Sequence, residues 1–170
     1  MTALSVIGIG SPHAADQLGW QVIDMLRQNP AIQDLGSTRL SLHRCDRPGL
    51  SLLEYLKGVE CAILVDAVEG GTAGRHVRLT REQLVVDPAR LSSHAAGVAE
   101  ALALGDSLQL LPSRLVLHGM EIGSAGIDFI PAETNLRQLA GAIAAEVAHC
   151  CQEPDNLKNA PGTVTKTNTQ

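Results

Sequence analysis

The chain has 170 residues, of which 45 % are hydrophobic and only 2 % are aromatic, and its formal net charge is −5. The length suits one compact domain, and the apolar fraction is that of a globular protein, so a mainly disordered chain is excluded. The sequence contains no run of Lys and Arg and few aromatic residues for base stacking, so nucleic-acid binding is not expected. No apolar stretch is long enough to span a membrane and we recognise no signal peptide, so we expect a cytoplasmic protein.

The apolar pattern alternates between strand-like and helix-like periods along the chain. In the first part, we predict strands over 3–8, 38–43 and 61–65 and helices over 18–26 and 50–56, with Asn29-Pro30 ending the first helix. In the second part, we predict strands over 76–80 and 114–118 and helices over 93–104 and 133–151. Gly105-Asp106 is predicted to end the helix over 93–104.

This alternation predicts an α/β fold with three layers, in which a mostly parallel, twisted sheet of about five strands has helices on both faces. Segment 76–80 follows its predecessor too closely for a helical crossover, so an antiparallel orientation is an option for it. We expect residues 1–151 to form a single domain. The polar tail, 152–170, is expected to be disordered because it has too little apolar surface to bury.

The four cysteines, Cys45, Cys61, Cys150 and Cys151, do not have the spacing of a disulfide framework or of a zinc site. Adjacent cysteines cannot chelate a metal as a C-x-x-C pair does. We therefore expect all four to be reduced and structural.

Three polar residues occur where predicted strands lead into loops or helices: Asp16, Asp66 and His94. Ligands of open α/β sheets bind at the carboxyl ends of the strands, so these residues are predicted to meet at one edge. Each also has a simpler interpretation, because Asp16 suits a helix N-cap, Asp66 suits turn amides, and a histidine is often a surface or packing residue.

His94 is expected to be neutral, because a helix N-terminus disfavours a charged imidazole. A neutral imidazole and two carboxylates form a three-ligand set that suits borderline divalent ions such as Ni²⁺, Zn²⁺ or Co²⁺.

Other kinds of site fit the sequence less well. Gly8-Ile9-Gly10 begins like a dinucleotide fingerprint, but its third glycine would fall at His13. No G-x-S-x-G motif is present for a serine hydrolase. A Cys45 nucleophile would need a histidine partner that the sequence does not identify.

The chain resembles the [NiFe]-hydrogenase maturation proteases, which trim the C-terminus of the hydrogenase large-subunit precursor. The resemblance extends from about residue 4 to about residue 150 and depends on four segments in order. These are 8–12 (GIGSP) with 16–19 (DQLG), 63–67 (ILVDA), 93–99 (SHAAGVA) and 115–121 (LVLHGME).

The resemblance implies an endopeptidase that acts after nickel insertion and recognises the nickel bound in the precursor. Matched residue by residue, it assigns Asp16, Asp66 and His94 as metal ligands and catalytic residues, the same three that the strand-end argument selects. The nickel is supplied by the precursor, although other divalent ions could occupy the site. We expect the precursor to be the partner, no binding to nucleic acid or membranes, and a monomer.

This sequence departs from the family pattern in the first loop, where Ala15 replaces one of two adjacent acidic residues. Gln17 competes with Asp16 in the alignment, but an amide is a poorer ligand for divalent ions. The loop after the second strand contains Asp46, Arg47 and Gly49, which we assign to substrate recognition. Arg47 would pair with the precursor's C-terminal extension or simply form a surface ion pair.

Two other functions remain open at this stage. One is a different metal-dependent amide hydrolase on the same scaffold. The other is a nickel-dependent binding or chaperone module that recognises the precursor but does not cleave it. For the endopeptidase, we favour metal-assisted attack on the scissile bond, with an aspartate acting as general base as the alternative.

Overall fold

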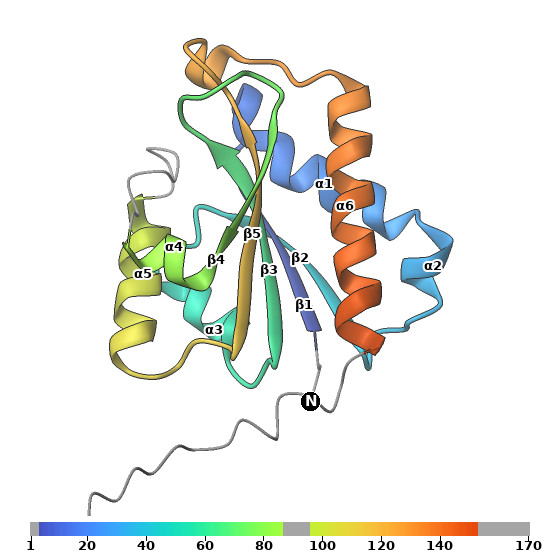
Figure 1. Cartoon of the computed structure of the whole chain (residues 1–170), viewed down its shortest axis with the longest axis vertical. Helices are drawn as coiled ribbons and strands as arrows, with labels where there is room; N and C mark the ends of the chain where they lie inside the picture. The colour runs from blue at the N-terminus through green and yellow to red at the C-terminus, as the bar shows by residue number, and fades with distance from the viewer. Residues whose placement is uncertain (1–3, 87–95, 153–170) are drawn as a thin grey trace, which may run out of the picture.

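The computed structural model describes residues 4–86 and 96–152 (Figure 1). The elements of the first half are β1 (Leu4–Gly10), η1 (Ala14–Gln17), α1 (Leu18–Arg27), α2 (Pro30–Gln33), β2 (Leu40–Asp46), η2 (Gly49–Ser51), α3 (Leu52–Leu56) and β3 (Cys61–Val68). Those of the second half are β4 (His76–Thr80), α4 (Arg81–Val86), α5 (Ala96–Ser107), β5 (Arg114–Glu121), η5 (Gly126–Asp128) and α6 (Glu133–Gln152).

The strands form one five-stranded sheet in the order β2-β1-β3-β5-β4. Every neighbouring pair is parallel except β4 with β5, which is antiparallel. The strands β1, β3 and β5 therefore end at the same edge, which lies at the top of Figure 1 beside η1 and η5. This edge is the one at which the sequence predicts the site.

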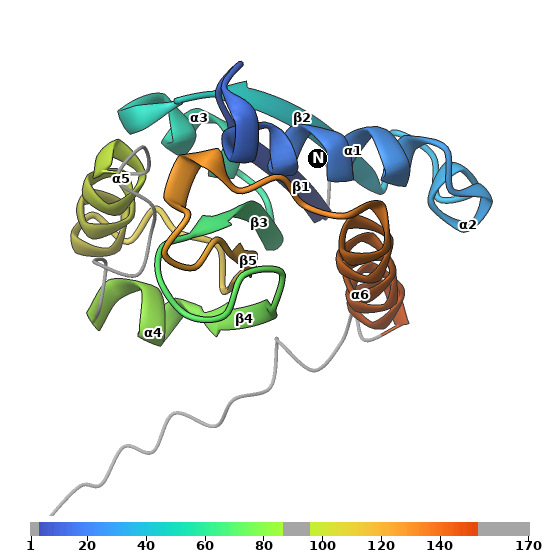
Figure 2. The ribbon, with the colours of Figure 1, turned by 90° about the horizontal axis from the view of Figure 1, so that it is seen from above.

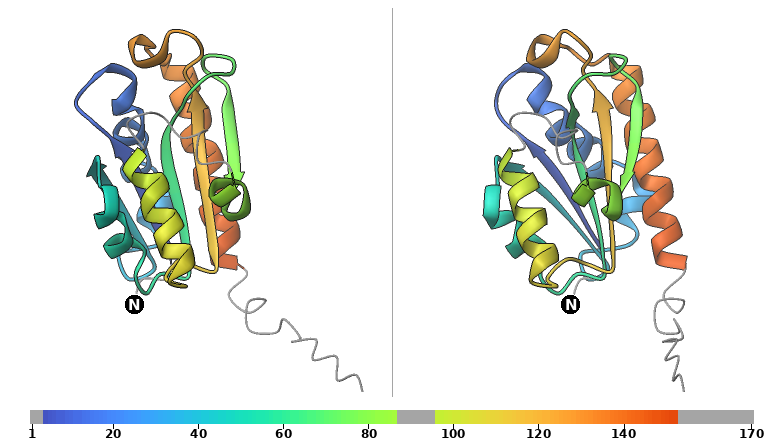
Figure 3. Two further views of the ribbon diagram at one scale, coloured as in Figure 1. Left: turned by 90° about the vertical axis from the view of Figure 1, so that its left-hand side faces the viewer. Right: turned by 60° about the vertical axis from the view of Figure 1, so that its left-hand side comes forward.

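Helices cover both faces of the sheet, as Figures 2 and 3 show. One apolar cluster joins alternate residues of β1, β3 and β5 to α1, α2 and α6, and a second joins the intervening residues to α3, α4 and α5. Alternation of side chains along each strand produces the two clusters, since successive residues face opposite sides of the sheet. The predicted three-layer α/β fold is confirmed.

The predicted elements occur in the predicted order, and the antiparallel orientation of β4 is confirmed. Two short helices, α2 and α4, were not predicted. The first helix, α1, does end before Pro30, at Arg27. Pro30 also begins α2, and Asn29 Oδ1 accepts a 3.0 Å hydrogen bond from the backbone N–H of Ala31 as its N-cap. Proline is favoured at the first position of a helix because the backbone N–H that it lacks would have no hydrogen-bond acceptor within the helix there.

The expected helix stop at Gly105-Asp106 is wrong, because α5 continues to Ser107. A Cβ on Gly105 would come within 2.6 Å of the Leu111 side chain and 2.8 Å of Leu53. This glycine therefore packs closely against the ends of two leucine side chains inside the helix and does not end it. Asp106 accepts a 2.6 Å hydrogen bond from Arg81.

The expected tail and the first residues of the helix predicted over 93–104 lie outside the described residues. Within the described ranges, none of the helices combines the length and the apolar character required to traverse a bilayer.

Candidate metal-recognition site

Asp16 lies in η1, in the loop that connects β1 to α1, and its side chain is buried. Its Oδ2 accepts a 2.9 Å hydrogen bond from Ser11 Oγ, and its backbone oxygen accepts one from Ser11 N at 3.2 Å. Gln17, rather than Asp16, is the N-cap residue of α1. The carboxylate of Asp16 is thus oriented by the loop itself, and the N-cap interpretation of this residue is not supported.

Glycines let this loop lie directly against the sheet. A Cβ on Gly19 would meet the backbone oxygens of Ile9 and Val65, the latter at 2.8 Å, and a Cβ on Gly10 would meet the backbone oxygen of Asp16. Backbone atoms cannot move aside as a flexible side chain can, so only glycine fits at these two positions. The close approach places η1 over the carboxyl ends of β1 and β3.

Asp66 lies inside β3, on a strand whose residues are all buried. Its Oδ1 accepts a 2.7 Å hydrogen bond from the backbone N–H of Ala67. Its Oδ2 is buried and has no hydrogen-bond partner in residues 4–86 and 96–152. Buried polar atoms are nearly always paired, so this oxygen is suited to a proton or to a ligand.

Burial raises the pKa of Asp66 to about 8, against the lowering effect of the Ala67 N–H, and the Asp16 carboxylate raises it further. The two carboxyl groups are thus close enough to repel each other. Two neighbouring carboxyl groups are difficult to ionise when no positive charge is near. A bound cation stabilises their ionised form, because it compensates both negative charges. Asp16 therefore lies within electrostatic range of Asp66, at the edge where the sequence predicts the site.

The third predicted ligand, His94, lies outside the described residues. Among the described residues, no group of three or more His, Cys, Asp and Glu side chains is arranged to hold a metal ion. The nearest described part of the same segment is the start of α5, where a Cβ on Gly97 would lie 2.9 Å from the Cα of Gly49. The assignment of His94 stays a prediction.

The predicted recognition loop follows β2 and lies beside the end of β1, because Arg47 N donates to Gly10 O at 3.0 Å. Arg47 Nε donates to Asp46 Oδ1 at 2.8 Å, and both side chains are about half exposed. Arg47 and Gly49 have positive φ angles of 41° and 51°. The Arg47 side chain therefore forms the surface ion pair in this structure, at the same edge as Asp16.

Glu121 is a further residue at this edge, and its role was not predicted. It ends β5, is buried, and accepts 2.7 Å hydrogen bonds from both Nε and Nη2 of Arg75. It also accepts one from Thr72 N at 2.8 Å, so it fixes the 70–75 loop. The sequence indicated such a role only by placing this acidic residue directly after the mostly apolar segment 115–120.

Trp20 was also missed. Its Nε1 donates to Cys45 O at 3.0 Å, and the Arg44 guanidinium lies 4.9 Å from the centre of the indole ring. These contacts attach the first turn of α1 to the end of β2, and they thereby connect the Asp16 loop to the recognition loop.

Comparisons with known proteins were made for the whole chain. No family model matches it. Among curated proteins, the hydrogenase expression/formation protein HoxM of Azotobacter vinelandii is 27 % identical over 127 residues, which are 71 % of this chain and 59 % of HoxM. The corresponding protein HupD of Bradyrhizobium diazoefficiens is 27 % identical over 120 residues, which are 68 % of this chain and 60 % of HupD. The match thus spans less than two thirds of these relatives.

Solved structures give a broader match. The hydrogenase maturating endopeptidase HybD from E. coli superposes with a TM-score of 0.68 and 17 % identity, over 90 % of this chain and 93 % of that one. The [NiFe]-hydrogenase maturation protease HybD from Thermococcus kodakarensis gives a TM-score of 0.62 and 15 % identity, over 88 % and 97 %. Identities this low establish the fold alone. The chain therefore has the fold of the [NiFe]-hydrogenase maturation proteases.

Proposed function

We propose that the protein is a metal-dependent endopeptidase that removes the C-terminal extension of a [NiFe]-hydrogenase large-subunit precursor after nickel insertion. The observation that supports this most directly is the buried Oδ2 of Asp66, which has no hydrogen-bond partner among the described residues. In addition, the negative charge of Asp16 raises the pKa of Asp66. Such a pair is suited to a cation, and the fold is the one that hydrogenase maturation proteases share.

In this proposal, the nickel is part of the substrate. Asp16 and Asp66, with His94 as the third ligand, complete the open coordination positions of a nickel ion that the precursor already holds. A precursor without nickel lacks these bonds and dissociates, so affinity depends on correct metal insertion. Because the pKa of Asp66 is about 8, nickel binding also displaces a proton from this carboxyl group at neutral pH.

Hydrolysis follows by metal-assisted attack, in which the bound nickel polarises the scissile carbonyl or activates a water molecule. The alternative is that Asp16 or Asp66 removes the proton from the attacking water while the nickel positions the chain. The hydrogen bond from Ser11 to Asp16 holds that carboxylate in one orientation for either role. Asp46, Arg47 and Gly49, at the same edge, contact the extension of the precursor.

The experiment combines the purified protein with nickel-loaded and with nickel-free precursor and measures the mass of the precursor over time. We expect loss of the C-terminal extension only from the nickel-loaded form. The Asp16→Ala, Asp66→Ala and His94→Ala variants should fail to process it. The Asp34→Asn variant, which changes an exposed aspartate remote from this edge, is the matched control and should process it normally.

Equal cleavage of nickel-free precursor would contradict the proposal. Normal processing by the Asp16→Ala variant would remove that residue from the site. Nickel-dependent binding without mass loss would instead identify a binding or chaperone module. Turnover of small amides without any effect on the precursor would identify a different metal-dependent hydrolase.

A further inference from the structure

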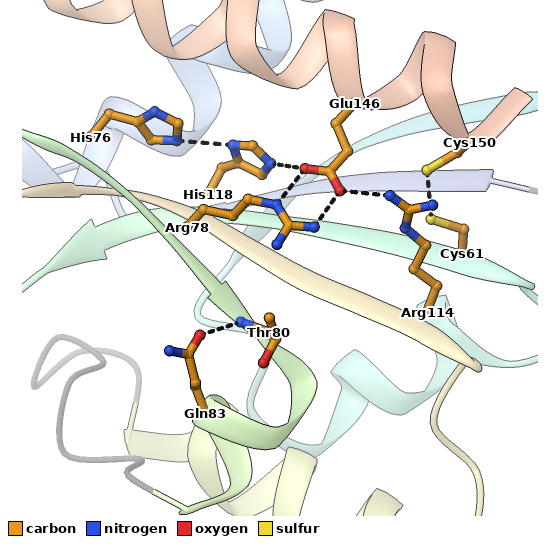
Figure 4. Close-up of polar contacts among 9 residues, drawn as sticks. All are labelled: Cys61, His76, Arg78, Thr80, Gln83, Arg114, His118, Glu146 and Cys150. Carbon is orange, nitrogen blue, oxygen red and sulfur yellow. Dashed lines mark hydrogen bonds and ion pairs between the residues drawn. The ribbon is translucent and has the colours of Figure 1, made fainter.

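A second group of reactive side chains lies between α6 and the sheet (Figure 4). The last turn of α6 and the start of β3, which contribute its thiols, lie at the end of the molecule opposite to the candidate site (Figure 1). It contains two thiols, Cys61 in the first position of β3 and Cys150 in the last turn of α6. Their Sγ atoms are 3.2 Å apart, although the residues are 89 positions apart in the sequence. All four cysteines of the chain are free thiols in the structure.

The geometry of this pair is close to that of a disulfide. A disulfide has an S–S distance of about 2.05 Å, so the two sulfur atoms need to approach by only about 1 Å. Side-chain rotation together with a slight shift of the helix end can supply such a movement.

The surroundings of the two thiols are charged. Glu146, one turn before Cys150 in α6, accepts hydrogen bonds from Arg78 at 2.8 and 2.6 Å and from Arg114 at 3.1 Å. Figure 4 shows the Arg114 guanidinium beside the two sulfur atoms. Two arginines and one glutamate leave an excess of positive charge near Cys150, which favours a thiolate.

The two cysteines have different roles in this environment. The hydrogen bond between Cys61 and Cys150 lowers the pKa of Cys150, and Arg114 and Arg78 lower it further against burial and the Glu146 charge. The same hydrogen bond, together with burial, raises the pKa of Cys61. Cys150 is half-buried, whereas Cys61 is only 6 % exposed. Cys150 is therefore the thiol that an oxidant reaches, and Cys61 is the one that resolves the intermediate.

We propose that Cys61 and Cys150 form a reversible disulfide with low-molecular-weight disulfides such as glutathione disulfide as the oxidant. The Cys150 thiolate attacks one sulfur of glutathione disulfide and releases one glutathione thiolate, which leaves a mixed disulfide on Cys150. Cys61 then gives its proton to that thiolate and attacks Cys150 Sγ, releasing the second glutathione. Two protein thiols are oxidised, and one glutathione disulfide is reduced to two glutathione molecules.

This disulfide would connect the end of α6 to the start of β3 and would leave the candidate site at the opposite edge unchanged. It is independent of the proposed function, since none of its residues lies in that site. Cys151 is the matched control, because it is adjacent to Cys150 and partly buried but has no sulfur partner among the described residues.

The test incubates the full chain with glutathione disulfide, blocks the remaining thiols by alkylation and maps the cysteines by mass spectrometry of tryptic peptides. Trypsin leaves Cys61 in the peptide 58–75 and both Cys150 and Cys151 in 138–158. We expect these two peptides to become linked, and the link to disappear on reduction. The Cys151→Ser variant should still form it, whereas the Cys150→Ser variant should not.

The Cys61→Ser variant should retain one glutathione on Cys150, because the resolving thiol is absent. In the unmodified protein, fragment ions of the linked peptide that separate Cys150 from Cys151 identify the bonded cysteine, so a variant that does not fold leaves the test intact. Full alkylation of both Cys61 and Cys150 after oxidation would overturn the proposal. Loss of the link in the Cys151→Ser variant would also overturn it.

Discussion

The carboxylate of Glu146 in α6 lies 2.6 Å from Nε2 of His118 in β5. A carboxylate can only accept a hydrogen bond, so His118 Nε2 carries the hydrogen. Burial lowers the pKa of His118, which makes the ring neutral near pH 7, and its Nδ1 then accepts from His76 Nε2 at 2.9 Å. Glu146 thus joins β4, β5 and α6 through one buried carboxylate.

Replacing Glu146 with Gln should reduce the free energy of unfolding by about 3 kcal/mol, because it replaces one buried acceptor oxygen with an NH2 donor and leaves two arginines and a histidine without their charged partner. Chemical denaturation measures the effect. The matched control is Glu133→Gln, which removes an exposed ion pair with Arg137 and should change the stability by less than about 0.5 kcal/mol. Equal effects of the two substitutions would show that Glu146 contributes no more than a surface residue.

The same cluster predicts a dependence of stability on pH. The Arg78 hydrogen bonds, with smaller contributions from His118, lower the pKa of Glu146 to about 2 from its ordinary value of 4.5. The stability that this carboxylate contributes is therefore present above pH 4.5 and is lost as the pH falls toward 2. The pKa of His118 in the folded protein is below its ordinary value of 6.5. Stability therefore also falls as the pH drops below 6.5, because the histidine of the unfolded chain binds a proton at a higher pH than that of the folded protein.

Denaturation at a series of pH values between about 3 and 8 measures both effects. The difference in stability between the unmodified protein and Glu146→Gln should be constant above pH 6.5, where His118 does not titrate, and should become smaller as the pH falls below 4.5. A difference that stays constant down to the lowest pH would show that the Glu146 carboxylate has an ordinary pKa.

Asp66→Asn should make the protein more stable and at the same time inactive in precursor processing. Burial raises the pKa of Asp66 to about 8, so the folded protein keeps a proton on this group that the unfolded chain releases, and the stability falls as the pH rises from about 4 to 8. Asparagine removes the charge, and we expect a gain on the order of 2 kcal/mol at pH 8 that disappears near pH 4.

Asp34→Asn controls for the loss of one negative charge at an exposed position and should show no such pH-dependent gain. Reduced stability of Asp66→Asn at pH 8 would contradict the raised pKa and would mean that a nearby donor stabilises the ionised Asp66 carboxylate.

The sheet, and the edge at which Asp16 and Asp66 lie, could be predicted from the sequence because both depend on local patterns. Apolar runs define β1 and β3, and the parallel order brings the loops after them to one edge, which places Asp16 near Asp66. Short helices such as α2 and α4 were missed, since they contain too few residues to show a period of 3.6.

The Glu146 cluster could not be predicted, because its members come from β4, β5 and α6 and meet only through tertiary packing. A signal was nevertheless present. His118 interrupts an apolar strand, and Glu146 is a charged residue three positions after the buried Ile143 on the inner face of α6. A charge at a core position implies a buried partner but does not identify it.

The close packing of the first loop predicts that Gly19→Ala will be strongly destabilising. The added Cβ would meet backbone atoms of Ile9 and Val65, which cannot move without separating α1 from the sheet. We expect a loss of about 2–4 kcal/mol and impaired precursor processing, because Asp16 is in the same loop. Gly141→Ala is the control, since a Cβ there meets nothing within 4 Å, and it should stabilise α6 by about 0.5–1 kcal/mol. Destabilisation by Gly141→Ala, or tolerance of Gly19→Ala, would contradict the packing argument.

Oxidation of Cys61 and Cys150 should raise the melting temperature of the protein. The disulfide would close a loop between residues that are 89 positions apart, and a loop of that size strongly restricts the unfolded chain. We expect an increase of about 5–15 °C over the reduced protein, measured by thermal denaturation before and after treatment with glutathione disulfide. Cys151→Ser should show the same increase, and Cys150→Ser should show none. A linked protein that melts at or below the temperature of the reduced one would mean that strain in the folded state, at the junction of α6 and β3, outweighs the restriction of the unfolded chain.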